Sequence, residues 1–121
     1  MTIVLRKGCG KVVQVREPSE QVQNAGRLWH EHRHAPFPAS LRRAEFGDTD
    51  MVLLDAETAG CVLTWLNNGG VLDPKRTHIL QSCIEDLDRV IPQINEPAGT
   101  KYYERLRQLA LLVSGALSSP K

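Results

Sequence analysis

Apolar residues recur every three or four positions along much of the chain, and short polar segments rich in Gly, Pro and Asn separate these stretches. That spacing places the apolar side chains on one side of a helix. It predicts four main helices, over 20–34, 56–66, 74–91 and 100–117. Because the connections are short, we expect neighbouring helices to pack antiparallel as a bundle.

The segment from residue 74 to residue 91 carries the clearest pattern. Asp73 and Pro74 form a helix cap followed by proline at the first helical position, an arrangement that proline favours. Pro92 is expected to end or kink the helix. One side of this helix is predicted to be apolar, and its members are Ile79, Leu80, Cys83, Ile84, Leu87, Val90 and Ile91.

The limits of the other helices are predicted from caps and breakers. Asp55 is expected to cap the helix over 56–66, and the segment 67–70 to end it. Ala59, Val62, Leu63 and Leu66 are the expected buried stripe of that helix. The apolar run 51–54 fits a short strand or the first turn of a buried helix, because periodicity does not separate these two.

The N-terminal segment has a different pattern. Residues 2–6 and 12–16 are rich in β-branched side chains and flank the glycine-containing segment 7–11, which predicts a β-hairpin. A short helix is predicted over 40–46. The expected fold class is therefore mainly α, a bundle of about four helices with a small N-terminal hairpin, in one domain over residues 1–121.

Composition agrees with a globular domain, since 41% of the residues are apolar and 24% are charged. No apolar run is long enough to span a bilayer, and residues 1–10 hold no stretch of signal-peptide length. The three cysteines are odd in number and lack paired spacing, which argues against a disulfide scaffold. A cytoplasmic location is the resulting expectation.

Charge is distributed unevenly. Residues 1–43 carry eight basic and three acidic side chains, whereas residues 44–121 carry seven basic and eleven acidic ones. The two parts either face each other, or are simply solvated, or the basic part binds an anion. Candidate anion contacts are Arg27, Arg33, Arg42 and Arg43. They form no continuous run, so nucleic acid is not the expected partner. An anion or nucleic-acid binder that acts through the basic N-terminal third is a further alternative function.

The segment 30–34 matches the pattern H-E-x-x-H. On a helix, His30 and His34 share one side and could bind one zinc ion, with Glu31 polarising a bound water. A small metal-dependent hydrolase is therefore one alternative function, and it needs a third ligand. Arg33 inside the motif and the helix end at His34 favour another interpretation, a histidine-rich helix C-terminus that interacts with the helix dipole.

The cysteines differ in their surroundings. Cys9 lies between two glycines, and Lys7 and Lys11 flank it, so it is the candidate reactive thiol. The alternative is an incidental cysteine in a turn. Cys61 and Cys83 lie on apolar helix sides, where cysteine behaves as a small hydrophobic residue.

A resemblance covers roughly residues 36–112. The segments 53–56, 58–61, 64–66 and 72–73, followed by Arg76, resemble a group of small uncharacterised bacterial proteins. The resemblance implies a free-standing soluble domain and assigns no catalytic residue.

The pattern as a whole shows no nucleophile paired with a base and no cofactor-binding loop. We therefore predict a non-catalytic binding or regulatory module, whose partner is a protein or a second copy of the chain. Trp29, Phe37, Phe46 and Trp65 are candidates for its interface, because aromatic residues are enriched there, or they belong to the core.

Overall fold

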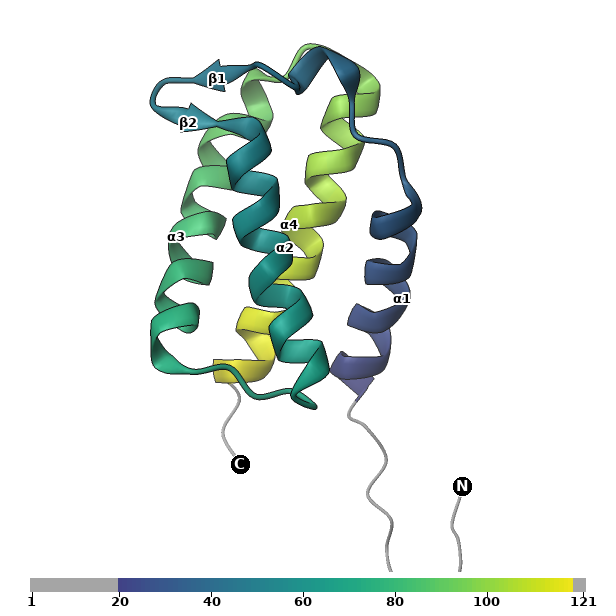
Figure 1. Ribbon diagram of the computed structural model, residues 1–121, viewed down its shortest axis with the longest axis vertical. Helices are drawn as coiled ribbons and strands as arrows, with labels where there is room; N and C mark the ends of the chain where they lie inside the picture. Colours follow the sequence, from purple (N-terminus) through teal and green to yellow (C-terminus); the bar gives the residue numbers. More distant parts are fainter. Residues whose placement is uncertain (1–19, 119–121) are drawn as a thin grey trace, which may run out of the picture.

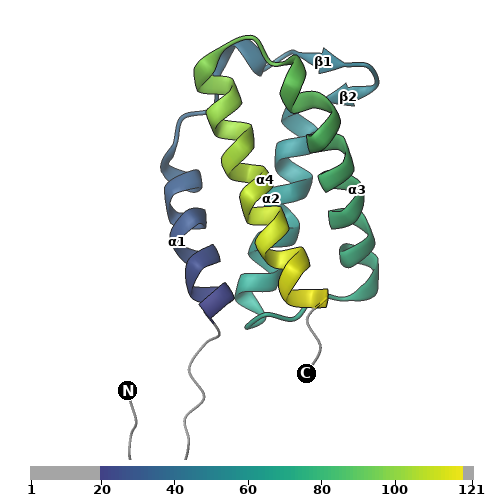
Figure 2. The same ribbon diagram turned by 180° about the vertical axis from the view of Figure 1, so that it is seen from behind.

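The computed structural model describes residues 20–118, and its four main helices form an antiparallel bundle (Figure 1). They are α1 (Glu20–His34), α2 (Met51–Asn67), α3 (Pro74–Val90) and α4 (Pro97–Ser118). Helices α2 and α4 lie together in the middle, and α1 and α3 pack on opposite sides of that pair (Figure 2). The predicted helical bundle is confirmed.

Helix α3 follows its sequence signals closely. The Asp73 carboxylate accepts a hydrogen bond from the backbone N–H of Arg76 at 2.8 Å, and Pro74 occupies the first helical position. The helix gives way at Val90 to a short 3-10 helix, η2 (Ile91–Gln93), which contains Pro92. The predicted apolar side is buried at Leu80, Cys83, Ile84, Leu87 and Val90.

Helix α2 begins at Met51, five residues before the predicted start. Asp50 is the N-cap, and its carboxylate accepts from the Leu53 backbone N–H at 3.0 Å. The run 51–54 is therefore the first turn of a helix and not a strand. The prediction that Asp55 caps this helix is wrong, because the chain is already helical there and Asp55 is free to make tertiary contacts.

A small antiparallel hairpin lies between residue 44 and the start of α2. Strand β1 (Glu45–Phe46) pairs with β2 (Thr49–Asp50), and Gly47 takes the turn with φ 63°. Positive φ favours glycine, because it has no Cβ to clash. The predicted α-rich fold class is confirmed, and the small hairpin that the structure describes is a different one from the hairpin predicted over residues 2–16.

Two predictions about irregular segments have different outcomes. The predicted helix over 40–46 is wrong beyond its first turn, because only η1 (Ala39–Leu41), a 3-10 helix, is helical in that segment. The hairpin predicted over residues 2–16 lies outside the described residues.

The core lies between α2, α3 and α4. Its largest fully buried side chains include Trp65, Tyr103, Leu87 and Leu106. The indole N–H of Trp65 has no hydrogen-bond partner, so this ring is held by apolar packing. Helix α4 starts at Pro97 rather than at the predicted Thr100. Its buried residues include Tyr102, Leu106, Leu109 and Val113, which recur at the helical spacing of three and four.

Within residues 20–118, no helix combines the length and the apolar composition needed to cross a membrane.

Candidate functional site

The two outer histidines of the H-E-x-x-H segment lie on the surface at the end of α1. The rings of His30 and His34 are 4.4 Å apart between centroids, so they share one side as predicted. His34 uses Nδ1 to donate a hydrogen bond to the His30 carbonyl oxygen at 2.8 Å. Among the described residues, no group of three or more His, Cys, Asp or Glu side chains is arranged to hold a metal ion.

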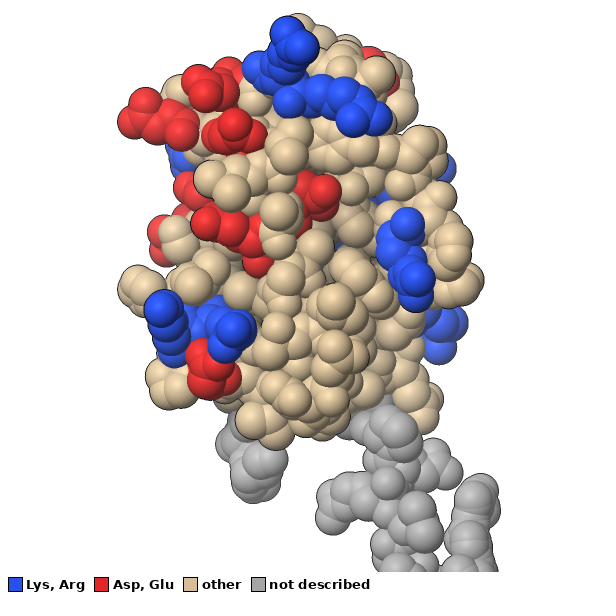
Figure 3. Space-filling model, viewed as in Figure 1, with Lys and Arg blue, Asp and Glu red and all other residues tan. Residues whose placement is uncertain are grey.

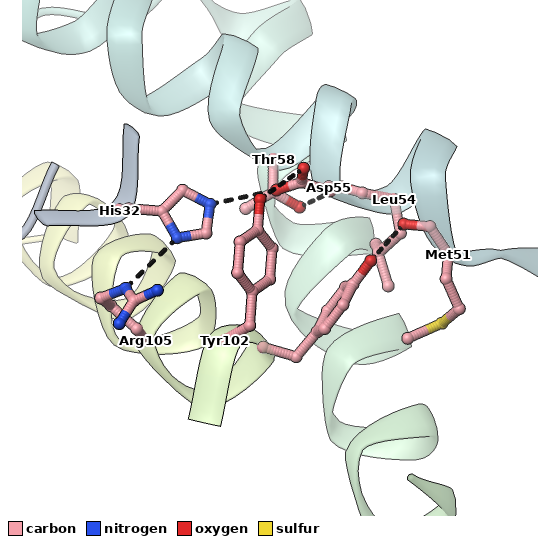
Figure 4. A network of polar contacts seen from close by, with 8 residues as sticks. His32, Met51, Leu54, Asp55, Thr58, Tyr102 and Arg105 are labelled. Atoms are coloured by element: carbon pink, nitrogen blue, oxygen red, sulfur yellow. Dashed lines mark hydrogen bonds and ion pairs between the residues drawn. The ribbon is translucent and has the colours of Figure 1, made fainter. Parts of the chain in front are cut away.

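The middle histidine of the segment belongs instead to a buried polar cluster. His32 is only 4% exposed, and its Nε2 lies 3.1 Å from the Asp55 carboxylate. The Tyr102 hydroxyl donates to the other Asp55 oxygen at 2.9 Å, and Arg105 Nε lies 3.4 Å from His32 Nδ1. Figure 4 shows these side chains converging from α1, α2 and α4.

The hydrogen-bond partners of His32 indicate its tautomer, that is, which ring nitrogen carries the hydrogen. Arg105 can only donate, so Nδ1 of His32 is the acceptor and Nε2–H donates to Asp55. Both ring nitrogens are therefore engaged, and neither is available to remove a proton from a substrate. Burial, and then the Asp55 charge, raise the pKa of Tyr102, which keeps its hydroxyl protonated as a donor. The cluster therefore links α1, α2 and α4 by hydrogen bonds inside the bundle.

Sequence reasoning found only part of this cluster. Helical spacing places His32 on the same side of the 20–34 helix as Ala25, Leu28 and Trp29, and His32 is buried in the structure. Its partner was missed because Asp55 was assigned to a helix cap, and Tyr102 lies 47 positions beyond Asp55. A carboxylate inside a mostly apolar helix was the available signal, since a buried charge requires a partner.

Burial lowers the expected reactivity of the Cys61 and Cys83 thiols. Burial raises the pKa of the Cys83 thiol to about 11, and it also raises the pKa of Cys61. Both cysteines are free, and Cys61 Sγ donates to the Arg76 carbonyl oxygen at 3.6 Å. A raised thiol pKa lowers the thiolate fraction and hence the reactivity. Cys9 lies outside the described part of the chain.

The four candidate anion contacts are not gathered at one place. Arg27 and Arg33 are six positions apart on α1, which puts them on different sides of the helix. Arg42 and Arg43 follow η1, and the Arg42 guanidinium lies 5.9 Å from the centre of the Phe37 ring.

Arg27 also lines a groove between α1 and α4. The groove has a volume of about 510 Å³, and its apolar lining residues are Leu28, Leu111 and Leu112. Arg27 donates a hydrogen bond to the Asn24 side chain, and Glu31 lines the same groove. A carboxylate beside the arginine makes this groove a poor place for an anion.

Helix α2 has a second apolar side that the bundle leaves uncovered. Its covered side includes Leu54, Val62 and Trp65. On the other side, Val52 is 43% exposed, Leu53 56% and Leu63 39%. We call the exposed residues Val52, Leu53, Ala56, Gly60 and Leu63 the open face of α2.

The predicted buried stripe of this helix is wrong at Leu63. Only two of the seventeen residues of α2, Asp55 and Glu57, carry a charge. Apolar residues therefore surround most of the helix, and periodicity alone does not identify the side that faces the core.

Charged side chains flank the open face at two different heights. Asp48, Asp50, Glu57 and Asp86 line a small cavity of about 110 Å³ near the start of α2. Lys75 and Arg76 lie in the first turn of α3, and Arg76 pairs with Asp73 at 2.6 Å. Figure 3 shows acidic groups above and basic groups below on the α3 side, next to a broad uncharged surface over α2.

Comparisons with protein-family models, with curated proteins and with solved structures found no match for this chain. The resemblance to small bacterial proteins therefore stays a prediction, and the functional argument rests on the geometry of residues 20–118.

Proposed function

We propose that the protein is a non-catalytic binding module, which recognises an apolar helical surface of a protein partner by the open face of α2. The observation that carries this proposal is that α2 is apolar on both sides, although the bundle covers only one of them. A helix at the surface of a bundle normally has one polar side. An uncovered apolar face is typical of a contact surface.

The residues of the open face suit a helical partner. Leu53, Ala56, Gly60 and Leu63 follow one another at spacings of three and four, which makes a continuous ridge along the helix. Burying apolar surface stabilises a complex by roughly 25 cal/mol per Å², before the entropy of association is subtracted. The half-exposed leucines provide most of that gain.

The polar cluster supports a non-catalytic role. His32 directs both ring nitrogens to groups of its own chain, and it is closed off from solvent. We include a cytoplasmic location in the proposal, because the two described cysteines are free thiols and a reducing compartment keeps thiols in that form.

Glutamate substitution on the open face tests the proposal. Leu63 and Leu111 are both 39% exposed, but Leu111 lies on α4 beside the other groove. Immobilised Leu63→Glu protein should lose the partner that the wild-type protein retains, whether that partner is another protein or an untagged copy of the chain. Leu111→Glu should retain it, because the charge is placed away from the open face.

Circular dichroism of both variants should match the wild-type spectrum, so that a loss of binding reports on the surface. Equal retention by Leu63→Glu and wild-type protein contradicts the proposal. Loss of the partner in Leu111→Glu alone would assign binding to the groove between α1 and α4 instead.

A further inference from the structure

We infer that the open face of α2 binds a second copy of this chain, and that the two α2 helices cross antiparallel at Gly60. This inference rests on the proposed function and names its partner. Three observations carry it: a glycine that the fold does not require, an arrangement of large and small residues that complements itself, and charges that pair when one copy is turned over.

Gly60 lies in the middle of the open face. A Cβ built on it meets nothing within 4 Å, so the bundle itself has space for alanine at this position. Glycine inside a helix destabilises it by comparison with alanine, which makes an unforced glycine informative. Gly26 on α1 has the same space around it, but Gly60 is the one that lies between exposed apolar side chains of α2. A missing side chain at this point allows a second backbone to approach closely.

The sizes of the residues complement each other in an antiparallel pair. Crossing at Gly60 brings Leu63 of one copy beside Ala56 of the other, three to four positions away on the opposite side of the crossing point. The Leu63 side chain of each copy then meets the small Ala56 of the other, as close helix packing requires. A two-fold axis repeats the contact, so one surface serves both copies.

Charge decides between the antiparallel and the parallel arrangement. The contact from Cys61 Sγ to the Arg76 carbonyl oxygen holds the start of α3 level with Cys61, just past Gly60. Turning the second copy over about Gly60 therefore brings its Lys75 to the level of Glu57 in the first. In a parallel two-fold pair the α3 flanks of the two copies would lie on opposite sides of the interface, so Glu57 of one copy and Lys75 of the other would not meet. The acidic and basic groups lie on the same flank of α2 in Figure 3, as the antiparallel pairing needs.

The size of the face predicts a weak, concentration-dependent dimer. A helix of 17 residues is about 25 Å long, so a single helix pair covers less area than a standard stable interface. Analytical ultracentrifugation of the full chain over a wide concentration range should show a monomer–dimer equilibrium.

Substitution of Gly60 tests the crossing point by two measurements, dimer affinity and melting temperature, which should change in opposite directions. Gly60→Ala should weaken dimerisation by about tenfold or more, because the added methyl groups separate the helices. The same variant should raise the melting temperature of the dilute monomer, since alanine favours the helix. Gly26→Ala is the matched control: it should raise the melting temperature and leave dimerisation unchanged. Equal dimerisation of Gly60→Ala and wild-type protein would overturn the crossing point.

A charge exchange tests the orientation. Glu57→Lys and Lys75→Glu should each weaken dimerisation by a few-fold at low salt, and the double variant should restore it. A double variant that is no stronger than the single variants would overturn the antiparallel pairing.

The outcomes separate this inference from the proposed function. A chain that stays monomeric at every concentration, but retains another protein in a Leu63-dependent way, refutes self-association and leaves the binding module intact. Binding that is independent of Leu63 refutes both.

Discussion

Helices α1 and α3 pack on opposite sides of the central α2–α4 pair, but different forces hold them there (Figure 1). Helix α3 buries five residues, all of them apolar or cysteine. Helix α1 is nearly as long and buries only Ala25 and His32. Helix α3 is held by fully buried apolar side chains, whereas α1 combines partly buried apolar side chains with the buried hydrogen bonds of His32.

This difference affects how each helix separates from the bundle. Detaching α3 exposes Leu80, Leu87 and Val90 and opens the main core, so it is equivalent to global unfolding. Detaching α1 breaks the contact between His32 and Asp55 and uncovers Ala25, but the large apolar side chains of α1 that pack on the core, Val22, Leu28 and Trp29, are only partly buried. We therefore expect α1 to open locally at a lower free energy than the rest of the molecule.

The largest effect is expected on the α3 side. Leu87 is fully buried, and Leu87→Ala should lower the free energy of unfolding by about 2–5 kcal/mol, because it removes apolar contacts and leaves a cavity. Chemical denaturation measures this change. A loss of only a few tenths of a kcal/mol would mean that α3 is not held by its apolar side.

A smaller and more local effect is expected on the α1 side. His32→Ala should lower the free energy of unfolding by about 1–3 kcal/mol, because it removes a hydrogen-bond partner from both Asp55 and Arg105. Hydrogen exchange should show faster exchange in α1 and little change in α3. Tyr102→Phe removes one hydroxyl donor to Asp55 and should have a weaker effect in the same direction. An equal increase of the hydrogen-exchange rate in all four helices would show that α1 unfolds together with the rest of the bundle.

The smallest effect depends on pH and concerns the start of α3. The hydrogen bond from the Arg76 backbone N–H, and then the Arg76 side chain, lower the pKa of Asp73 below its ordinary value of 3.8. The ionised form is therefore the stabilising one. Its contribution is present above pH 3.8 and is lost as the pH falls through the lower pKa of the folded state.

Asparagine at this position separates the cap from its charge. Asp73→Asn keeps an oxygen that can cap the helix, so helical content should be retained. The urea midpoint of this variant should depend less on pH below 3.8 than that of the wild-type protein. An unchanged pH dependence would show that other carboxylates dominate acid unfolding.

The sequence predicts α3 well because its signals are local and agree with one another. Asp73 and Pro74 mark the start, and the apolar side is unambiguous. Helix α2 is predicted less well, because the run 51–54 suits a strand or a helix and because an apolar helix has no polar side to reveal its orientation. The error at Asp55 comes from the first cause, and the error at Leu63 comes from the second.

The polar cluster is not predictable from local sequence patterns, for a different reason. His32, Asp55 and Tyr102 come from three helices, and their meeting depends on the packing of the whole bundle. The H-E-x-x-H pattern drew attention to His30 and His34, whereas the buried residue between them makes the tertiary contacts.

The two tryptophans of the chain lie in different surroundings, Trp29 on α1 and Trp65 on α2 in the core. Trp65 is sealed in the core without a hydrogen-bond partner, and Trp29 lies half-buried on α1 with its ring centre 6.2 Å from that of His32. An indole in an apolar environment emits at shorter wavelength than one in contact with water. The protein thus carries two built-in optical probes, and single-tryptophan variants would let the departure of α1 be timed separately from the opening of the core.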